Sequence, residues 1–140
     1  MKKKMILFVC VANYCRSPVA ERLFNYKNTS EYYAESAGLI QFKQTSMENR
    51  SKKFLEVEGI KTVGHIPKKI NLDQINKCSI VYALDFDVLN ELRREFPENY
   101  AKFRILSNDG IADPINENDS KYHFQMVKIR NEIEKIKKML

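Results

Sequence analysis

Residues 5–18 read MILFVCVANYCRSP, and this stretch decides the fold class of the chain. The apolar run 5–9 is typical of a strand that is buried on both faces of a parallel sheet. Pro18 then favours the first turn of a helix, where its missing N–H is not needed. We therefore expect a buried strand that passes into a helix through the short loop 10–17.

This loop has the spacing of an anion-binding site. Cys10 and Arg16 enclose five residues, which are Val11, Ala12, Asn13, Tyr14 and Cys15. That length lets the backbone curl so that its N–H groups converge on one anion. The helix that follows points its positive end at the same place. We expect residues 11–16 to bind a phosphate group.

Cys10 is the predicted nucleophile of this loop. A cysteine close to a helix N-terminus and to an arginine is favoured as the thiolate, which is the reactive form. The planar fork of Arg16 can hold two oxygens of a phosphoryl group during in-line transfer, and the Ser17 hydroxyl can donate to the sulfur. A buried structural cysteine would explain Cys10, but not the arginine, the asparagine or the abrupt helix start.

The composition is that of a soluble globular protein, with 44% hydrophobic and 30% charged residues. Its 140 residues suit a single domain, so we expect one domain over residues 1–140. No stretch approaches the roughly 18 consecutive apolar residues of a membrane span, and the N-terminus lacks a signal-peptide cleavage site. We expect a cytoplasmic protein without membrane contact.

The cysteines and the charge distribution exclude further classes of protein. Cys10, Cys15 and Cys78 are too few and too irregular for a disulfide framework or a zinc site, and reduced thiols fit the cytosol. The net charge of +6 favours anionic ligands. The basic residues are scattered, however, with short clusters only at residues 2–4 and at 137–138, so we expect no nucleic-acid partner.

Strand and helix patterns alternate along the rest of the chain. The apolar run 79–84 predicts a second clear strand, and 32–35 and 103–106 predict weaker ones. Four groups of apolar residues have helical spacing: Val19, Ala20, Leu23 and Phe24; Phe54, Leu55 and Val57; Val88, Leu89, Leu92 and Phe96; and Tyr122, Met126, Ile129, Ile133, Ile136 and Leu140. The alternation predicts an α/β fold with a four-stranded, parallel, twisted sheet and helices on both faces.

The polar stretch 107–120 is expected to supply an acid, because an alkoxide or phenolate leaves phosphorus readily only with a proton. It contains Asp109, Asp113 and Asp119, and only Asp113 precedes a proline, which restricts its backbone. The residues leave Asp113 and Asp109 as candidates, with Asp113 favoured. In a parallel sheet this stretch lies at the same edge as the nucleophile loop.

Segments along nearly the whole chain resemble the low-molecular-weight protein tyrosine phosphatases, in the same order. Residues 9–18 resemble the signature of that family, and Asp113-Pro114 resembles its downstream acid dipeptide. Three further segments agree: Glu35-Ser36-Ala37-Gly38, Gly64-His65 before Pro67, and Ala83-Leu84-Asp85.

The resemblance implies that phosphomonoesters are hydrolysed in two steps. Cys10 attacks phosphorus while Asp113 protonates the leaving oxygen, and Asp113 then activates the water that hydrolyses the phosphocysteine. Arg16 and the loop amides hold the equatorial oxygens, so no metal or other cofactor is needed. The implied substrate is a protein that carries phosphotyrosine, the product is inorganic phosphate, and the enzyme is a monomer.

The resemblance also assigns supporting roles. Asn13 would hold the strained loop through hydrogen bonds with Ser17, Ser36 and His65. By itself each histidine, His123 included, would be taken as an ordinary surface or core residue.

Cys15 has two interpretations. It either fills space as a small apolar side chain or forms a reversible disulfide with Cys10 that protects the nucleophile from over-oxidation. The family favours the redox role. Cys78 is expected to be inert.

The sequence departs from the family pattern at a few positions. Ala12 stands where a glycine is usual, which adds a methyl group at a tight bend. Lys69 replaces a usual arginine. Ile115 and Asn116 follow the acid dipeptide where the family often has aromatic residues, which leaves Tyr14 as the main aromatic contact for a substrate ring.

Three alternative functions compete with the phosphatase interpretation. An arsenate reductase on the same fold needs two further downstream cysteines, and only Cys78 is present. A phosphocysteine carrier of sugar transport lacks the arginine and the acid. A binding module that recognises phosphorylated partners without turnover stays open because of Ala12. The sequence does not distinguish phosphotyrosine, phosphoarginine and small phosphoesters as substrates.

Overall fold

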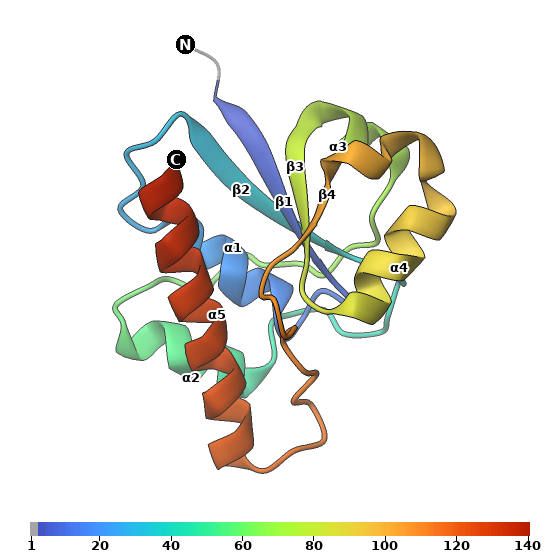
Figure 1. Cartoon of the computed structure of the whole chain (residues 1–140). Helices are drawn as coiled ribbons and strands as arrows, with labels where there is room; N and C mark the ends of the chain where they lie inside the picture. Colours follow the sequence, from blue (N-terminus) through green and yellow to red (C-terminus); the bar gives the residue numbers. More distant parts are fainter. Residues whose placement is uncertain (1–2) are drawn as a thin grey trace.

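A four-stranded sheet runs through the middle of the computed structural model, which describes residues 3–140 (Figure 1). Lys2, which belongs to the N-terminal lysine cluster, lies outside the described residues. The strands are β1 (Lys4–Cys10), β2 (Tyr32–Gly38), β3 (Cys78–Ala83) and β4 (Phe103–Ile105). Their order in the sheet is β2-β1-β3-β4, and every neighbouring pair is parallel. The predicted parallel α/β fold is confirmed.

Helices cover both faces of this sheet. They are α1 (Ser17–Asn25), α2 (Asn49–Val57), α3 (Leu72–Lys77), α4 (Phe86–Glu95) and α5 (Asp119–Met139), with a short 3-10 helix at Pro97–Lys102. Figure 1 shows α1, α2 and α5 on one side of the sheet and α3 and α4 on the other. The polypeptide therefore forms three layers, as the alternation of patterns predicts.

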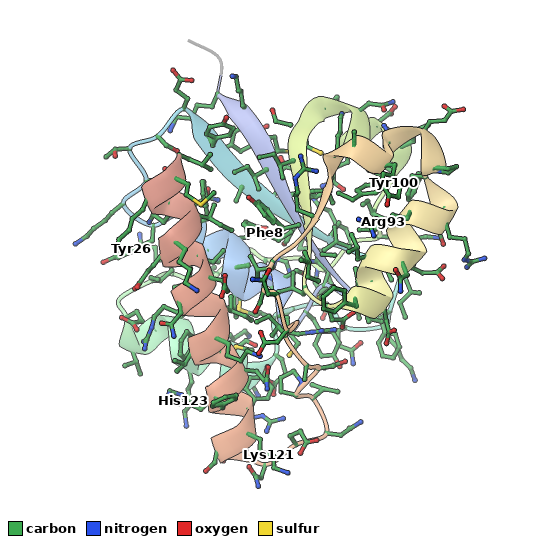
Figure 2. The ribbon with its side chains drawn as sticks, in the orientation of Figure 1. Phe8, Tyr26, Arg93, Tyr100, Lys121 and His123 are labelled. Carbon is green, nitrogen blue, oxygen red and sulfur yellow. The ribbon has the colours of Figure 1, made fainter. Side chains whose placement is uncertain are left out.

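The central strand β1 divides the core in two. Ile6 and Phe8 pack with residues of α1, α2 and α5, whereas Leu7 and Val9 pack with residues of α3 and α4. All four side chains are fully buried, because alternate residues of a strand point to opposite faces. Phe8 accordingly lies in the interior of the molecule (Figure 2). Burial of each such side chain contributes about 1.5–3 kcal/mol to stability.

Several details differ from the sequence-based expectation. Strand β2 continues to Gly38, three residues beyond the predicted end, since its polar Ser36 is buried against the neighbouring loop. The prediction that Val57 shares the apolar face of its helix was wrong, because its side chain is 87% exposed at the end of α2. Helix α3 was not expected, because its six residues are too few to show a helical period.

The carboxyl ends of the strands meet at one edge of the sheet. Leu84 follows β3 and donates its N–H to the carbonyl of Val9 in β1, at 3.0 Å. Ile111 donates in turn to the carbonyl of Leu84, at 2.8 Å. The chain runs from β1 to β2 on one side and returns to β3 on the other, and such a reversal leaves a crevice outside the strand ends. Within residues 3–140, no helix combines the length and apolar character needed to cross a membrane.

Candidate active site

The nucleophile loop begins where β1 ends. Cys10 is the last residue of β1 and is buried, and Pro18 stands in the first turn of α1. Arg16 occupies the N-cap position of α1, and its side chain makes no capping hydrogen bond. The first N–H groups of α1 are therefore free to serve an anion at this point, together with the positive end of the helix dipole.

Asn13 holds the loop in its bent form. Its backbone has a φ of 60°, a left-handed conformation that asparagine tolerates better than most residues. Its Nδ2 donates to the hydroxyls of Ser17 at 2.8 Å and Ser36 at 2.9 Å. Its Oδ1 accepts from the N–H of Lys68 at 3.1 Å. These hydrogen bonds balance the strain of the bend, and those with Ser17 and Ser36 were expected.

His65 supports the same residue from the other side. Its Nε2 lies 2.7 Å from the carbonyl oxygen of Asn13. A carbonyl can only accept, so Nε2 carries the proton and donates. Burial lowers the pKa of His65 below its ordinary value of 6.5, although the Asn13 carbonyl opposes this shift. The imidazole is accordingly neutral near pH 7.

The sulfur of Cys10 has one hydroxyl beside it. Ser17 Oγ lies 3.0 Å from Cys10 Sγ. Because Asn13 Nδ2 already donates to this oxygen, the Ser17 hydroxyl hydrogen is available for the sulfur. The geometry suits a hydroxyl that stabilises a thiolate, both when it attacks and when it leaves.

Arg16 is a buried cation whose side chain is only 1% exposed. Its Nη1 donates to Asp85 Oδ2 at 2.6 Å and to the carbonyl of Ile111 at 2.7 Å. Burial opposes the charged form, but the sulfur of Cys10 and the carboxylates of Asp85 and Asp113 raise the pKa of Arg16 above its ordinary value. Its Nε is buried without a hydrogen-bond partner, and an anionic oxygen would satisfy it.

Asp113 reaches the same site from the loop before α5. Its Oδ2 lies 3.9 Å from Arg16 Nη2, and its Oδ1 accepts from the N–H of Ile115 at 3.2 Å. Asp109, the second candidate, instead bonds with Ser107 and Lys128, and these partners lower its pKa. The geometry therefore favours Asp113 over Asp109 as the acid.

A pocket of about 200 Å³ joins these groups. The whole loop from Cys10 to Arg16 lines it, together with Ile40, Phe42, Asp113 and Ile115. Tyr14 and Phe42 stack with their ring centroids 6.3 Å apart and an interplanar angle of 11°, which gives the rim an aromatic wall. The sequence indicated Tyr14 but not Phe42, whose only signal is that it is the single aromatic residue in the largely polar segment 41–48.

Cys15 faces away from solvent toward the far side of the loop. Its Sγ lies 3.0 Å from the hydroxyl of Tyr122 in α5, and Ser51 Oγ donates to its carbonyl at 2.8 Å. Burial raises the pKa of the Cys15 thiol to about 12, so this thiol stays protonated at neutral pH. Cys10 and Cys15 are both free thiols in this structure, and the disulfide between them stays a prediction.

Cys78 and His123, for which the sequence predicts no role in the site, do not line this pocket. Cys78 is buried at the start of β3, and its thiol donates to the carbonyl of Ile75. His123 is exposed on α5 (Figure 2). Its ring lies beside that of Phe54, with the centroids 5.6 Å apart. Within residues 3–140, no three side chains of His, Cys, Asp or Glu gather in a way that could hold a metal ion.

Asp85 is a site residue for which no role was predicted from the sequence. It caps α4, because the N–H of Val88 donates to its Oδ1 at 2.8 Å, and its Oδ2 pairs with Arg16. A strand that ends in Ala-Leu-Asp is a weak signal, since an aspartate before a helix is most simply explained as a cap.

The chain is similar in sequence and in fold to several known proteins. Residues 5–140 match the family described as "Low molecular weight phosphotyrosine protein phosphatase". The low molecular weight protein-tyrosine-phosphatase Ptp of Acinetobacter johnsonii is 30% identical over 119 residues, which cover 81% of this chain and 82% of the relative. A protein-arginine-phosphatase of Geobacillus stearothermophilus is 30% identical over 115 residues, which cover 78% and 77%. The low molecular weight protein tyrosine phosphatase from T. tengcongensis superposes with a TM-score of 0.91 at 25% identity, covering 99% of this chain and all of that one.

Proposed function

Because the chain belongs to the low molecular weight phosphotyrosine protein phosphatase family, we propose that it removes phosphate from phosphotyrosine in proteins through a phosphocysteine on Cys10. Membership makes it a hydrolase of this kind. One observation carries the residue assignments. Asp113, which is distant in sequence, lines the same pocket as Cys10 and Arg16 of the nucleophile loop.

In the first step, the Cys10 thiolate attacks phosphorus from the floor of the pocket. A sulfur–phosphorus bond forms while the bond to the leaving oxygen breaks, and the Asp113 carboxyl gives its proton to that oxygen. The Nε of Arg16 and the loop N–H groups hold the equatorial oxygens. Because Asp85 and Ile111 fix Nη1 of Arg16, these donors are in place before the charge moves.

In the second step, the Asp113 carboxylate takes a proton from a water molecule, and the water oxygen attacks phosphorus. The sulfur–phosphorus bond breaks and inorganic phosphate is released. The electron pair returns to Cys10 as a thiolate, which the Ser17 hydroxyl at 3.0 Å stabilises as a leaving group. The enzyme is then restored, with its acid protonated again.

The aromatic wall supports an aryl phosphate as the substrate. Tyr14 and Phe42 offer stacked rings at the rim, where a phosphotyrosine ring would lie once its phosphate reached Cys10. Relatives include a protein-arginine-phosphatase, so phosphoarginine is the second candidate substrate. We expect a phosphotyrosine peptide to be hydrolysed with a higher kcat/KM than the matching phosphoarginine peptide. A higher kcat/KM for the phosphoarginine peptide would instead make phosphoarginine the proposed substrate.

The chemistry of the nucleophile indicates the compartment in which the enzyme works. A thiolate with a second cysteine nearby needs a reducing compartment, so we propose that the enzyme works in the cytoplasm on phosphorylated proteins. We further propose that it acts as a monomer, because the pocket is complete within one chain.

Hydrolysis of p-nitrophenyl phosphate tests the mechanism. We expect turnover by the wild type and none by Cys10→Ser, which still binds phosphate. With phenyl phosphate, a poor leaving group, Asp113→Ala should lower kcat by about 10²–10⁴-fold, whereas Asp109→Ala should stay within about twofold. A wild type without turnover would refute the phosphatase proposal, and equal losses in the two aspartate variants would overturn the choice of acid.

A further inference from the structure

The first turn of α2 contacts the nucleophile loop directly. Just before the helix begins, the N–H of Glu48 donates to the carbonyl of Tyr14 at 2.8 Å. One turn later, the hydroxyl of Ser51 donates to the carbonyl of Cys15, also at 2.8 Å. These two hydrogen bonds to adjacent carbonyls fix the start of α2 relative to the loop that carries Cys10.

Arg50 extends from the same turn to the loop that carries the acid. Its Nη1 donates to the carbonyl of Glu117 at 2.8 Å, and its Nη2 donates to the carbonyl of Ile115 at 3.0 Å. The two carbonyls lie two and four residues after Asp113. A guanidinium suits this task because its donors form a rigid fork, whereas a lysine offers one flexible point of contact.

The guanidinium of Arg50 is itself held in place. Its central carbon lies 4.0 Å from the centroid of the Tyr122 ring, a cation–π contact. Its Nε contacts Glu48 Oε1 at 3.5 Å, and the Arg50 side chain is only 27% exposed. The contact with Asp119 at 3.4 Å adds less, because the Asp119 side chain is 93% exposed.

The part of the acid loop before Asp113 has other supports. Ile111 is bonded to Leu84 and to Arg16, and the N–H of Ala112 donates to Gln125 Oε1 at 3.0 Å. The part after Asp113 has fewer. Within residues 3–140, only two hydrogen bonds join the main-chain atoms of residues 113–117 to another element. Both are donated by Arg50.

We propose that Arg50 is a positioning residue that holds the Asp113 carboxyl at the distance needed to protonate the leaving oxygen. The inference rests on the role proposed above for Asp113. One helical turn then sets the nucleophile loop and the acid loop relative to each other, through Glu48 and Ser51 on one side and Arg50 on the other. Arg50 acts through Asp113 and touches no reacting atom.

The test compares two leaving groups in the Arg50→Ala variant. The quantity to compare is kcat/KM, because it reports the steps up to departure of the leaving group, before Asp113 acts as the base. With phenyl phosphate, which depends on the acid, kcat/KM should fall roughly tenfold. With p-nitrophenyl phosphate, whose leaving group needs little protonation, kcat/KM should fall less than about threefold. Arg50→Lys should restore part of the loss with phenyl phosphate.

Arg130→Ala is the matched control. Like Arg50, Arg130 lies between α2 and α5. It belongs to α5, stacks on Phe54 of α2 and pairs with Glu58 at the end of α2, and its side chain is 34% exposed. Within residues 3–140, no hydrogen bond or ion pair joins Arg130 to the acid loop. We expect this variant to keep the wild-type ratio of kcat/KM values for the two substrates.

A double-mutant cycle separates this inference from a general loss of structure. In the Asp113→Ala background, Arg50→Ala should cause no further loss with phenyl phosphate. Additive losses, or equal losses on both substrates in the single variant, would overturn the role of Arg50 and leave the phosphatase mechanism intact. A wild type without turnover would instead refute the proposed function. If Arg50→Ala fails to fold, Arg50→Lys carries the same comparison, and an unchanged ratio there overturns the inference.

Discussion

Arg16 shows how a single residue connects the two halves of the site. Its guanidinium is almost completely buried, which would be costly without compensation. Asp85 and the Ile111 carbonyl occupy one end of the fork, and Asp113 lies near the other. The edge with Nε remains for a phosphate oxygen. An arginine with such fixed partners binds an anion without paying the entropy of ordering its side chain.

The Asp85→Asn variant tests whether the negative charge of Asp85 is needed to orient Arg16. The amide oxygen can still cap α4 by accepting from Val88, while the anionic partner of Arg16 is lost. We expect kcat/KM for p-nitrophenyl phosphate to fall roughly tenfold to a hundredfold, since a hydrogen bond between charged groups contributes about 1.5–3 kcal/mol.

Kinetics and thermal unfolding check this prediction together. The melting temperature of Asp85→Asn should stay closer to the wild type than that of Asp85→Ala, which also removes the cap. Asp87→Asn, an exposed change in the same helix, is the control and should leave kcat/KM unchanged. Wild-type kcat/KM in Asp85→Asn would show that Arg16 needs no carboxylate partner.

The tight bend of the nucleophile loop does not require a glycine at position 12. The residue with positive φ is Asn13, so Ala12 carries its methyl group without backbone strain. The close approach is instead made by Gly38 at the end of β2. A Cβ atom there would lie 2.8 Å from the carbonyl oxygen of Val11 and 3.0 Å from the backbone nitrogen of Asn13.

At the scale of elements, three separate segments hold the nucleophile loop. The end of β2 contributes Ser36, the segment before α3 contributes His65 and the N–H of Lys68, and α2 contributes Ser51. Each acts on a different atom of the loop. The loop is therefore shaped before substrate arrives, which keeps its N–H groups directed at one point.

The His65 contact makes stability depend on pH. Burial lowers the pKa of His65, so the unfolded chain binds this proton more readily than the folded one. The contribution of neutral His65 is present above the unfolded value of 6.5 and is lost as pH falls through the folded pKa. We expect the free energy of unfolding in urea to decrease between pH 7.5 and pH 5.

His65→Gln tests the origin of that decrease. Glutamine keeps an N–H donor for the Asn13 carbonyl but does not titrate, so the variant should lose less stability on acidification than the wild type. The exposed His123→Gln change should behave like the wild type. An identical pH dependence in all three proteins would assign the effect to other groups.

At the scale of the whole molecule, the sheet separates the cysteines. Cys78 pairs in register with Met5 at the start of β1, whereas Cys10 is the last residue of that strand. The offset of five residues, at roughly 3.3 Å each, separates the Cα atoms of the two cysteines by about 17 Å along the sheet. A disulfide needs Cα atoms within about 7 Å, so Cys78 cannot take over oxidation from Cys10 in this fold.

We therefore expect Cys78→Ala to keep wild-type turnover of p-nitrophenyl phosphate. Incubation with arsenate should leave Cys78 reduced. It is buried in β3 beside Met5, at the end of the sheet opposite to Cys10. Mass spectrometry of alkylated peptides measures this directly. Arsenate-dependent oxidation of Cys78 would contradict the prediction and favour the reductase alternative.

Much of the fold and part of the site could be predicted from local sequence signals. A strand, a loop of fixed length and a proline-led helix follow one another within residues 5–18, so their interactions are short in sequence and visible as spacing. The same is true of Asp113 next to its proline. Helix α3 was missed because six residues carry no period, and Phe42 because one aromatic residue in a polar loop has no pattern.

By itself, the sequence determined the parallel α/β class, the loop with Cys10 and Arg16, and the acid candidate, because backbone geometry and residue chemistry act locally. Only the tertiary structure decided which distant groups meet them. Asp85 orients Arg16 from the end of β3, and Arg50 holds the acid loop from α2. These contacts join residues about 65 to 70 positions apart, and such pairs come together only when packing of the sheet and helices brings the strand ends to one edge.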